Sequence, residues 1–132
     1  MNRNEEYSFE SDGFILEDMK SWKAAGKSNS SKLSPAMRNS VQPGQHVKLA
    51  FRFDTKDIEY WNYDTAYENL WVKILTRKEY HFLCGGKNIK KGMKYTGEID
   101  NDSIFRSDFI GKEIEFHYGN IIDILGENGK GV

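Results

Sequence analysis

The sequence predicts a mainly β domain: a small curved sheet or SH3-like barrel of five to six short strands, with one or two short N-terminal helices. Polar and apolar residues alternate in several short segments, as they do in strands with one buried face. Glycines and polar stretches separate these segments at the spacing of a small all-β fold. The chain has 132 residues, 14% of them aromatic, which is enough for one domain with its own core. An OB-like barrel is the second choice, because a local β pattern does not separate the two topologies.

Composition divides the chain into three parts: a polar arm at 1–33, a β domain at 34–126 and a flexible tail at 127–132. The arm carries a short strand predicted at 13–17 and one or two helical turns predicted within 18–25. Ser34 and Pro35 then have helix-start chemistry, because serine is a preferred N-cap and proline suits the first helical position. Proline and glycine at 43–44 end that helix, and we expect the chain to enter a strand directly after them.

The strands of the β domain follow from alternation. They are predicted at 46–53, 70–76, 79–84, 95–100, 113–117 and 121–125. In the first of them, the odd-numbered apolar residues are expected to face the core and the even-numbered residues, Ala50 among them, the solvent. The segment 79–84 is expected to be the hairpin partner of 70–76, followed by a basic loop at 87–94. Trp71 is expected to lie in the core.

Charge and cysteine content narrow the functional classes. Lysine and arginine number 19 against 20 aspartates and glutamates, a balance that argues against both a strongly basic nucleic-acid coat and an acidic DNA mimic. The single cysteine, Cys84, permits no internal disulfide and suits a reducing compartment. The first ten residues lack the apolar core of a signal peptide, and no apolar run approaches the roughly 20 residues that span a bilayer. We therefore expect a soluble cytoplasmic protein without membrane contact.

Five sequence blocks come in an order that resembles one bacterial family. The blocks are 38–44, 47–51, 70–74, 95–102 and 111–116. Over about residues 34–125 they resemble the YegJ-like bacterial proteins of unknown function. The chain has Ser103 where that family has a proline. The family also has a glutamate followed by an arginine where this chain has Glu68 followed by Asn69. Its connections at 54–67 and 81–94 are also longer than usual in the family.

The resemblance supplies little chemistry. It implies a small accessory protein, and small β-proteins of this general type sit in toxin–immunity or phage–defence loci. An immunity or anti-defence role is therefore the expected biological setting. Arg38, which opens the first shared block, is taken as a candidate binding residue on the same ground.

The first candidate binding surface is aromatic. The connection at 54–69 is long for a linker and dense in aromatic residues, which include Tyr60, Trp61, Tyr63 and Tyr67. Such side chains stack on bases or anchor a protein partner, and they also serve as a lid on the end of a barrel. The binding and lid interpretations are compatible, and both remain open.

The second candidate surface is basic. It comprises the lysines of the segment 85–94: Lys87, Lys90, Lys91 and Lys94. They would hold a phosphate or an acidic partner, although a solvated hairpin tip is the plainer interpretation. Lys73, Arg77 and Lys78 would extend this patch if the strands that carry them are adjacent.

A third group of residues is weighed for metal binding and catalysis. Asp100 and Asp102 flank an asparagine at the end of a strand, where they would suit a hard cation or a ligand hydroxyl, but turn chemistry is the favoured interpretation. The histidines lack the spacing of zinc motifs and are expected to be solvated: His46, His81 and His117. Cys84 has no base at a suitable position and is expected to be a plain thiol. We therefore predict no metal site, no cofactor and no catalytic residues.

These observations favour a non-enzymatic binding module. A protein partner is favoured, because the net charge is −1 and the aromatic content is high. The alternative is a nucleotide- or nucleic-acid-binding small β-barrel, in which the aromatic residues stack on bases and the lysines meet phosphates. An enzyme is the third choice, because the sequence shows no converging acid–base or nucleophile set.

Overall fold

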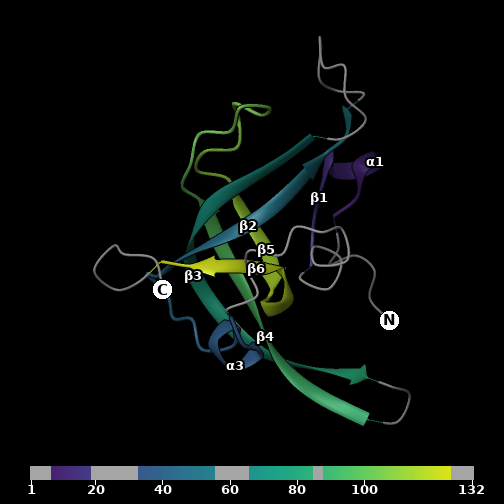
Figure 1. The fold of residues 1–132 in the computed structure, drawn as a ribbon, viewed down its shortest axis with the longest axis vertical. Helices are drawn as coiled ribbons and strands as arrows, with labels where there is room; N and C mark the ends of the chain where they lie inside the picture. Colours follow the sequence, from purple (N-terminus) through teal and green to yellow (C-terminus); the bar gives the residue numbers. More distant parts are fainter. Residues whose placement is uncertain (1–6, 19–32, 56–65, 85–87, 126–132) are drawn as a thin grey trace.

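The computed structural model describes residues 7–18, 33–55, 66–84 and 88–125, and for 82–84 and 88–90 the backbone alone. Within these residues the protein is one curled antiparallel sheet with two short α-helices (Figure 1). The strands are β1 Phe14–Leu16, β2 His46–Phe53, β3 Ala66–Cys84, β4 Asn88–Ile99, β5 Glu113–His117 and β6 Ile121–Ile124. The helices are α1 Phe9–Asp12, α3 Pro35–Arg38 and the single 3-10 turn η3 Tyr118–Asn120. The predicted mainly β, curved fold is confirmed.

Strand β2 holds the sheet together because three strands pair with it. β3 pairs along the whole of one edge, from His46 opposite Lys73 to Phe53 opposite Ala66. The other edge is shared, since β6 pairs with its first half and β1 with its second half. From β2 to β5 the strands follow in order as a meander, and η3 then returns the chain so that β6 lies beside β2. This connectivity suits the SH3-like alternative, because an OB fold is a Greek key.

Strand β3 is longer than predicted. It runs for 19 residues, and its register with β4 shifts between Ile74 and Thr76. The prediction that 79–84 folds back on 70–76 was therefore wrong, because both segments belong to this one strand. A bulge adds one residue and reverses the phase of the alternation, so the two halves look like separate strands in the sequence. The segment 88–94, predicted as a loop, is the paired half of β4.

The concave core is built from one face of each strand. The odd-numbered apolar residues of β2 are buried as predicted: Val47, Leu49, Phe51 and Phe53. Neighbouring phenylalanine rings pack at centroid distances between 5.1 and 6.2 Å; they belong to Phe14, Phe51, Phe53, Phe105 and Phe109. Tyr95 of β4 is also fully buried, and its hydroxyl donates to the carbonyl of Arg38 at 2.7 Å.

The outer face of the sheet is not wholly solvated. Ala50, predicted to face solvent, is fully buried, and that prediction was wrong. It points to the outer face, as the alternation requires, but Ile122 of β6 and Tyr67 of β3 cover it there. A second, small apolar cluster therefore lies on the side of the sheet opposite the main core.

Of the N-terminal elements, β1 and the start of α3 follow their sequence signals, whereas α1 at Phe9–Asp12 was not predicted. The Ser34 hydroxyl accepts the Met37 N–H at 3.1 Å, and Pro35 occupies the first helical position, so the predicted start of α3 is confirmed. The strand predicted at 13–17 is β1, which joins the sheet through β2. The helical turns predicted within 18–25, beyond Asp18, and the tail at 127–132 lie outside the described residues. Among the described residues, no helix has the length and apolar character to cross a bilayer.

Gly97 of β4 is required by close packing. Any Cβ at this position would lie 2.5 Å from Cγ1 of Val72 and 2.9 Å from the carbonyl oxygen of Lys73. We predict that Gly97→Ala lowers the free energy of unfolding by about 1–3 kcal/mol, because the neighbours must move apart. Chemical denaturation measures the loss, and Lys73→Ala at an exposed position of β3 is the control, expected within about 0.5 kcal/mol of the parent. Equal stability of Gly97→Ala and the parent would contradict this packing.

Candidate functional site

The far halves of β3 and β4 form a hairpin that extends beyond the rest of the sheet (Figure 1). β2 pairs with β3 only as far as Lys73, and β5 pairs with β4 only from Lys94 onward. Beyond those points the two strands have each other as their only strand partners among the described residues. Lys90 lies on the backbone of this hairpin opposite Phe82, whereas Lys87 lies outside the described residues.

A row of basic residues crosses the outer face where this hairpin meets the sheet. Lys78 of β3 lies opposite Lys94 of β4, and Lys94 lies opposite His117 of β5. The Lys94 ammonium lies 5.0 Å from the ring centroid of Tyr80. Like charges directly opposite each other on neighbouring strands repel, so the two lysines oppose the stability of the sheet. We call these three residues, Lys78, Lys94 and His117, the basic row.

The remaining basic candidates do not join this row. Strand alternation puts Lys91 on the other face from Lys94, where its ammonium lies 3.5 Å from the Glu79 carboxylate. Arg77 also points to that side and donates to the carbonyl of Asn39 at 2.7 Å, although its buried Nε has no hydrogen-bond partner among the described residues. Lys91 and Lys94, which were predicted to form one basic patch, thus lie on opposite faces of the hairpin. Lys78, which was predicted to extend that patch, belongs to the basic row.

The aromatic candidates lie partly outside the described residues, which include neither Tyr60, Trp61 nor Tyr63. Tyr67 is the first of them that the structure places, on β3 against the small outer cluster, with the Arg52 guanidinium 5.9 Å from its ring centroid. It covers Ala50 and so contributes to packing as well as to the outer surface.

Trp71 is half-buried on the outer face, so the prediction that it lies in the core was wrong. Leu70 and Val72 on either side of it are buried in the core, and alternation therefore turns Trp71 outward. It lies opposite Lys48 of β2, whose ammonium is 4.8 Å from the Trp71 ring centroid. Among the described residues, the cations of the outer face lie over aromatic rings: Arg52 over Phe9 and Tyr67, Lys48 over Trp71, and Lys94 over Tyr80.

Arg38 is 7% exposed, and its contacts are with the fold itself. Its Nε donates to the Ile121 carbonyl at 2.8 Å, and its own carbonyl accepts the Tyr95 hydroxyl. Burial lowers the pKa of the Arg38 guanidinium below its usual range. These bonds tie α3 to β6 and β4, a structural role for the arginine that the family resemblance singled out.

Asp100 and Asp102 follow directly after the end of β4 at Ile99. Asp100 lies 2.8 Å from the His46 imidazole, and the Asn101 side chain accepts the Trp71 N–H at 2.8 Å. Asp102 is exposed. In the part of the chain that the structure describes, no group of three histidine, cysteine, aspartate or glutamate side chains is placed to hold a metal ion.

The other titratable candidates are dispersed. His117 accepts the Gly119 N–H through Nδ1 at 3.0 Å and so helps to form η3, while His81 is exposed on the hairpin. The side chain of Cys84 lies outside the described residues.

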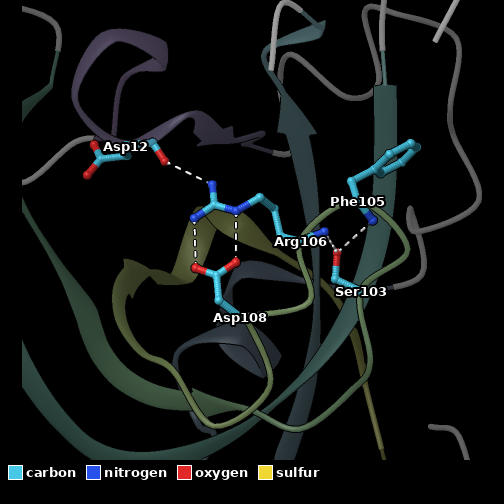
Figure 2. Close-up of polar contacts among 5 residues, drawn as sticks. All are labelled: Asp12, Ser103, Phe105, Arg106 and Asp108. Carbon is cyan, nitrogen blue, oxygen red and sulfur yellow. Dashed lines mark hydrogen bonds and ion pairs between the residues drawn. The ribbon is translucent and has the colours of Figure 1, made fainter. Parts of the chain in front are cut away.

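Sequence reasoning missed an ordered loop between β4 and β5. The Glu68 carboxylate accepts the Ser103 hydroxyl at 2.6 Å and the Ile104 N–H at 2.7 Å. The Ser103 hydroxyl in turn accepts the N–H groups of Phe105 and Arg106 at 3.2 and 3.0 Å (Figure 2). Ser103 replaces the proline of the resembled family, and a serine that can bond the next backbone N–H groups is the local signal for such a turn.

Arg106 and Asp108 fix the second half of this loop. Two parallel hydrogen bonds of 2.9 Å join the guanidinium to the carboxylate, and a longer one of 3.4 Å reaches the Asp12 carbonyl (Figure 2). The hydrogen bonds from Arg106 lower the pKa of Asp108, so its carboxylate stays ionised to lower pH than usual. The Arg106 guanidinium also lies 4.8 Å from the ring centroid of Phe109, a fully buried residue.

We predict that Glu68→Ala loosens this loop. The Ile104 N–H loses its acceptor, so amide hydrogen exchange at Ile104 should accelerate, and the free energy of unfolding should fall by about 1–2 kcal/mol. Glu79→Ala is the matched control, because it removes an exposed carboxylate whose ion pair with Lys91 contributes less than about 1 kcal/mol. Unchanged exchange at Ile104 in Glu68→Ala would show that the carboxylate does not hold the loop.

Comparison with known protein families, with curated proteins and with solved structures finds no match for this chain. The resemblance to the YegJ-like proteins therefore stays a prediction from five sequence blocks. Function is inferred from this chain's own side chains and their geometry.

Proposed function

We propose that the protein is a binding module that engages an acidic protein partner through the basic row and the outer face of the β3–β4 hairpin. The observation that carries the proposal is the pairing of Lys78 with Lys94 in register on neighbouring strands. Neighbouring strands lie about 4.8 Å apart, so the two lysines project from adjacent backbone positions on one face of the sheet. Carboxylates from a partner would be attracted to this concentration of positive charge.

The shape of the hairpin supports the same proposal. Lys78 is exposed in the basic row, and beyond this row the two strands have no other described strand beside them (Figure 1). The half-buried ring of Tyr80 lies beside Lys94 and supplies apolar contact area next to the charge. Tyrosine is enriched in protein interfaces, so Tyr80 supports a protein partner, whereas the lysines would lie at the polar rim of the contact. An immunity or anti-defence role is proposed as the biological setting, on the family resemblance alone.

A nucleic-acid ligand is the second candidate, and one observation favours it. Lys48 with Trp71, Arg52 with Tyr67 and Lys94 with Tyr80 are cation–aromatic pairs on the same outer face of the sheet, where rings can stack on bases while nearby cations meet phosphates. The net charge of −1 and the acidic residue Glu115, one row from Lys94 on the same face, count against it. A protein partner is therefore preferred.

The test compares two fluorescent probes, a glutamate decapeptide and a single-stranded thymidine decanucleotide. We predict that the parent protein binds the peptide and that the double variant Lys78→Glu/Lys94→Glu binds it at least about tenfold more weakly, because attraction becomes repulsion. Fluorescence anisotropy at several salt concentrations gives both affinities.

The control Lys91→Glu/Lys112→Glu makes the same change in net charge away from the basic row. It should lose affinity for the peptide by no more than about twofold. Equal losses in the two double variants would mean that net charge alone drives binding, which contradicts the proposal. Tighter binding of the oligonucleotide, with a steep decrease in added salt, would favour the second candidate instead.

A further inference from the structure

One edge of β3 has no described strand beside it near the end of the hairpin. At Ile74 this edge is still occupied, because Ile74 exchanges backbone hydrogen bonds of 2.8 Å with Gly44 and Gln45. The segment 79–83 pairs, among the described residues, only with β4 on the opposite edge, and we call its other side the open edge. Figure 1 shows this part of the hairpin lying away from the other strands of the sheet.

The hydrogen-bond pattern shows which backbone groups point to the open edge. The Met93 N–H donates to the Asn39 side chain at 2.8 Å and so is not bonded to β3. Met93 and Glu79 are therefore a pair that exchanges no hydrogen bonds, since bonded and non-bonded pairs alternate in an antiparallel ladder. The N–H and C=O groups of Glu79, and by the same alternation those of His81 and Leu83, point to the open edge. They offer a template for one more strand.

The outer edge of β4 is protected against such pairing, and the open edge is not. Natural sheet edges are commonly protected by lysines, prolines or bulges. β4 carries Lys90 and Lys91, and the Asn39 side chain occupies its Met93 N–H. The open edge reads Glu-Tyr-His-Phe-Leu, without lysine or proline, and the bulge of β3 lies before it. Tyrosine and phenylalanine are also favoured in strands.

The open edge is complementary to a second copy of itself. Two copies related by a two-fold axis pair antiparallel, and their outward-pointing residues, the odd-numbered ones, must lie opposite each other. With Tyr80 on the axis, Glu79 of each copy lies opposite His81 of the other, and the imidazole N–H can donate to the carboxylate. An axis at Glu79 would oppose two glutamates, and an axis at Lys78 would oppose two lysines. An axis at His81 would leave both kinds of side chain without a complementary partner.

The two side chains are accessible for this contact. Glu79 and His81 are both exposed, on the face of the hairpin that carries Lys91. The Lys91 ammonium lies 3.5 Å from one oxygen of the Glu79 carboxylate, and the Glu79 side chain is still 47% exposed. A carboxylate accepts several hydrogen bonds, so its other oxygen can accept from His81 of the second copy.

We propose that two copies of this protein associate through the open edge, so that their β3 strands pair antiparallel with Tyr80 at the two-fold axis. The two sheets then become continuous, and the outer faces that carry the basic rows point to the same side. The inference does not rest on the proposed acidic partner, because the copies meet at the edge of the hairpin and the basic row lies on its face.

Sedimentation velocity over a range of protein concentrations tests the association. The parent is expected to be in equilibrium between monomer and dimer. His81→Glu should weaken the dimer by at least about tenfold, because it places two carboxylates opposite each other at both contacts. The exchanged variant Glu79→His/His81→Glu restores the complementary pair and should return the affinity to within about threefold of the parent. Lys112→Gln makes the same change in net charge away from the hairpin and should alter the affinity by less than about twofold.

Cysteine variants test the register in a Cys84→Ser background. The backbone groups of Tyr80 face β4, so the two copies of this residue would form a non-hydrogen-bonded pair with Cα atoms about 4.5 Å apart, a distance that a disulfide can bridge. Tyr80→Cys should therefore cross-link the two copies on mild oxidation. Lys78→Cys is the control, because four strand residues, or roughly 13 Å, would separate it from its counterpart.

Three results would each overturn the proposal. They are a parent that sediments as a monomer at every concentration, an exchanged variant that does not regain the dimer, and equal cross-linking of the two cysteine variants. Because Glu79 and His81 are exposed, their variants should keep the unfolding midpoint of the parent, which shows that the fold is intact. None of these results bears on the basic row, which is tested with an acidic peptide.

Discussion

The fold depends on β2 keeping one face buried along its whole length. Three strands take their register from it, because β3 fills one edge and β1 and β6 divide the other. A slip of one residue would expose Val47, Leu49 and Phe51 together, and no single pairing could move without the others. The return of β6 is held by η3, where the Asn120 side chain accepts the His117 N–H and donates to the Glu17 carbonyl. The turn and the arm are thereby joined to the same core.

The register shift in β3 determines what the hairpin presents. If the pairing continued without it, Arg77 would lie opposite Lys94 on the outer face and Leu75 would face outward beside Thr96. With the shift, Arg77 instead bonds the Asn39 carbonyl near α3, and Lys78 takes the outer position. One inserted residue thus separates a structural arginine from an exposed lysine. Bulges often reorient side chains next to functional surfaces in this way.

Local alternation was sufficient to predict the regular strands and insufficient wherever contacts are distant in sequence. The bounds of β2 and β5 were predicted because period-two patterns run through them without interruption. The length of β3 was not predicted, because the bulge reverses the phase of the polar–apolar alternation within the strand. Ala50 was misassigned because burial there depends on Ile122, a residue 72 positions away. The ordered loop between β4 and β5 was missed for the same reason, since Glu68 and Ser103 are 35 positions apart.

A net charge of −1 conceals how the charges are distributed. The near balance of acids and bases argues against a protein that coats polyphosphate along its length. It does not argue against local patches, because screening confines each surface charge to roughly 10 Å. Lys78 and Lys94 lie together on the hairpin, and Asp100 and Asp102 lie together beyond the other end of β4. The two groups are separated along β4 by more than this screening length. A partner that binds at one end would therefore interact with the charges of that group and not with the net charge of the whole protein.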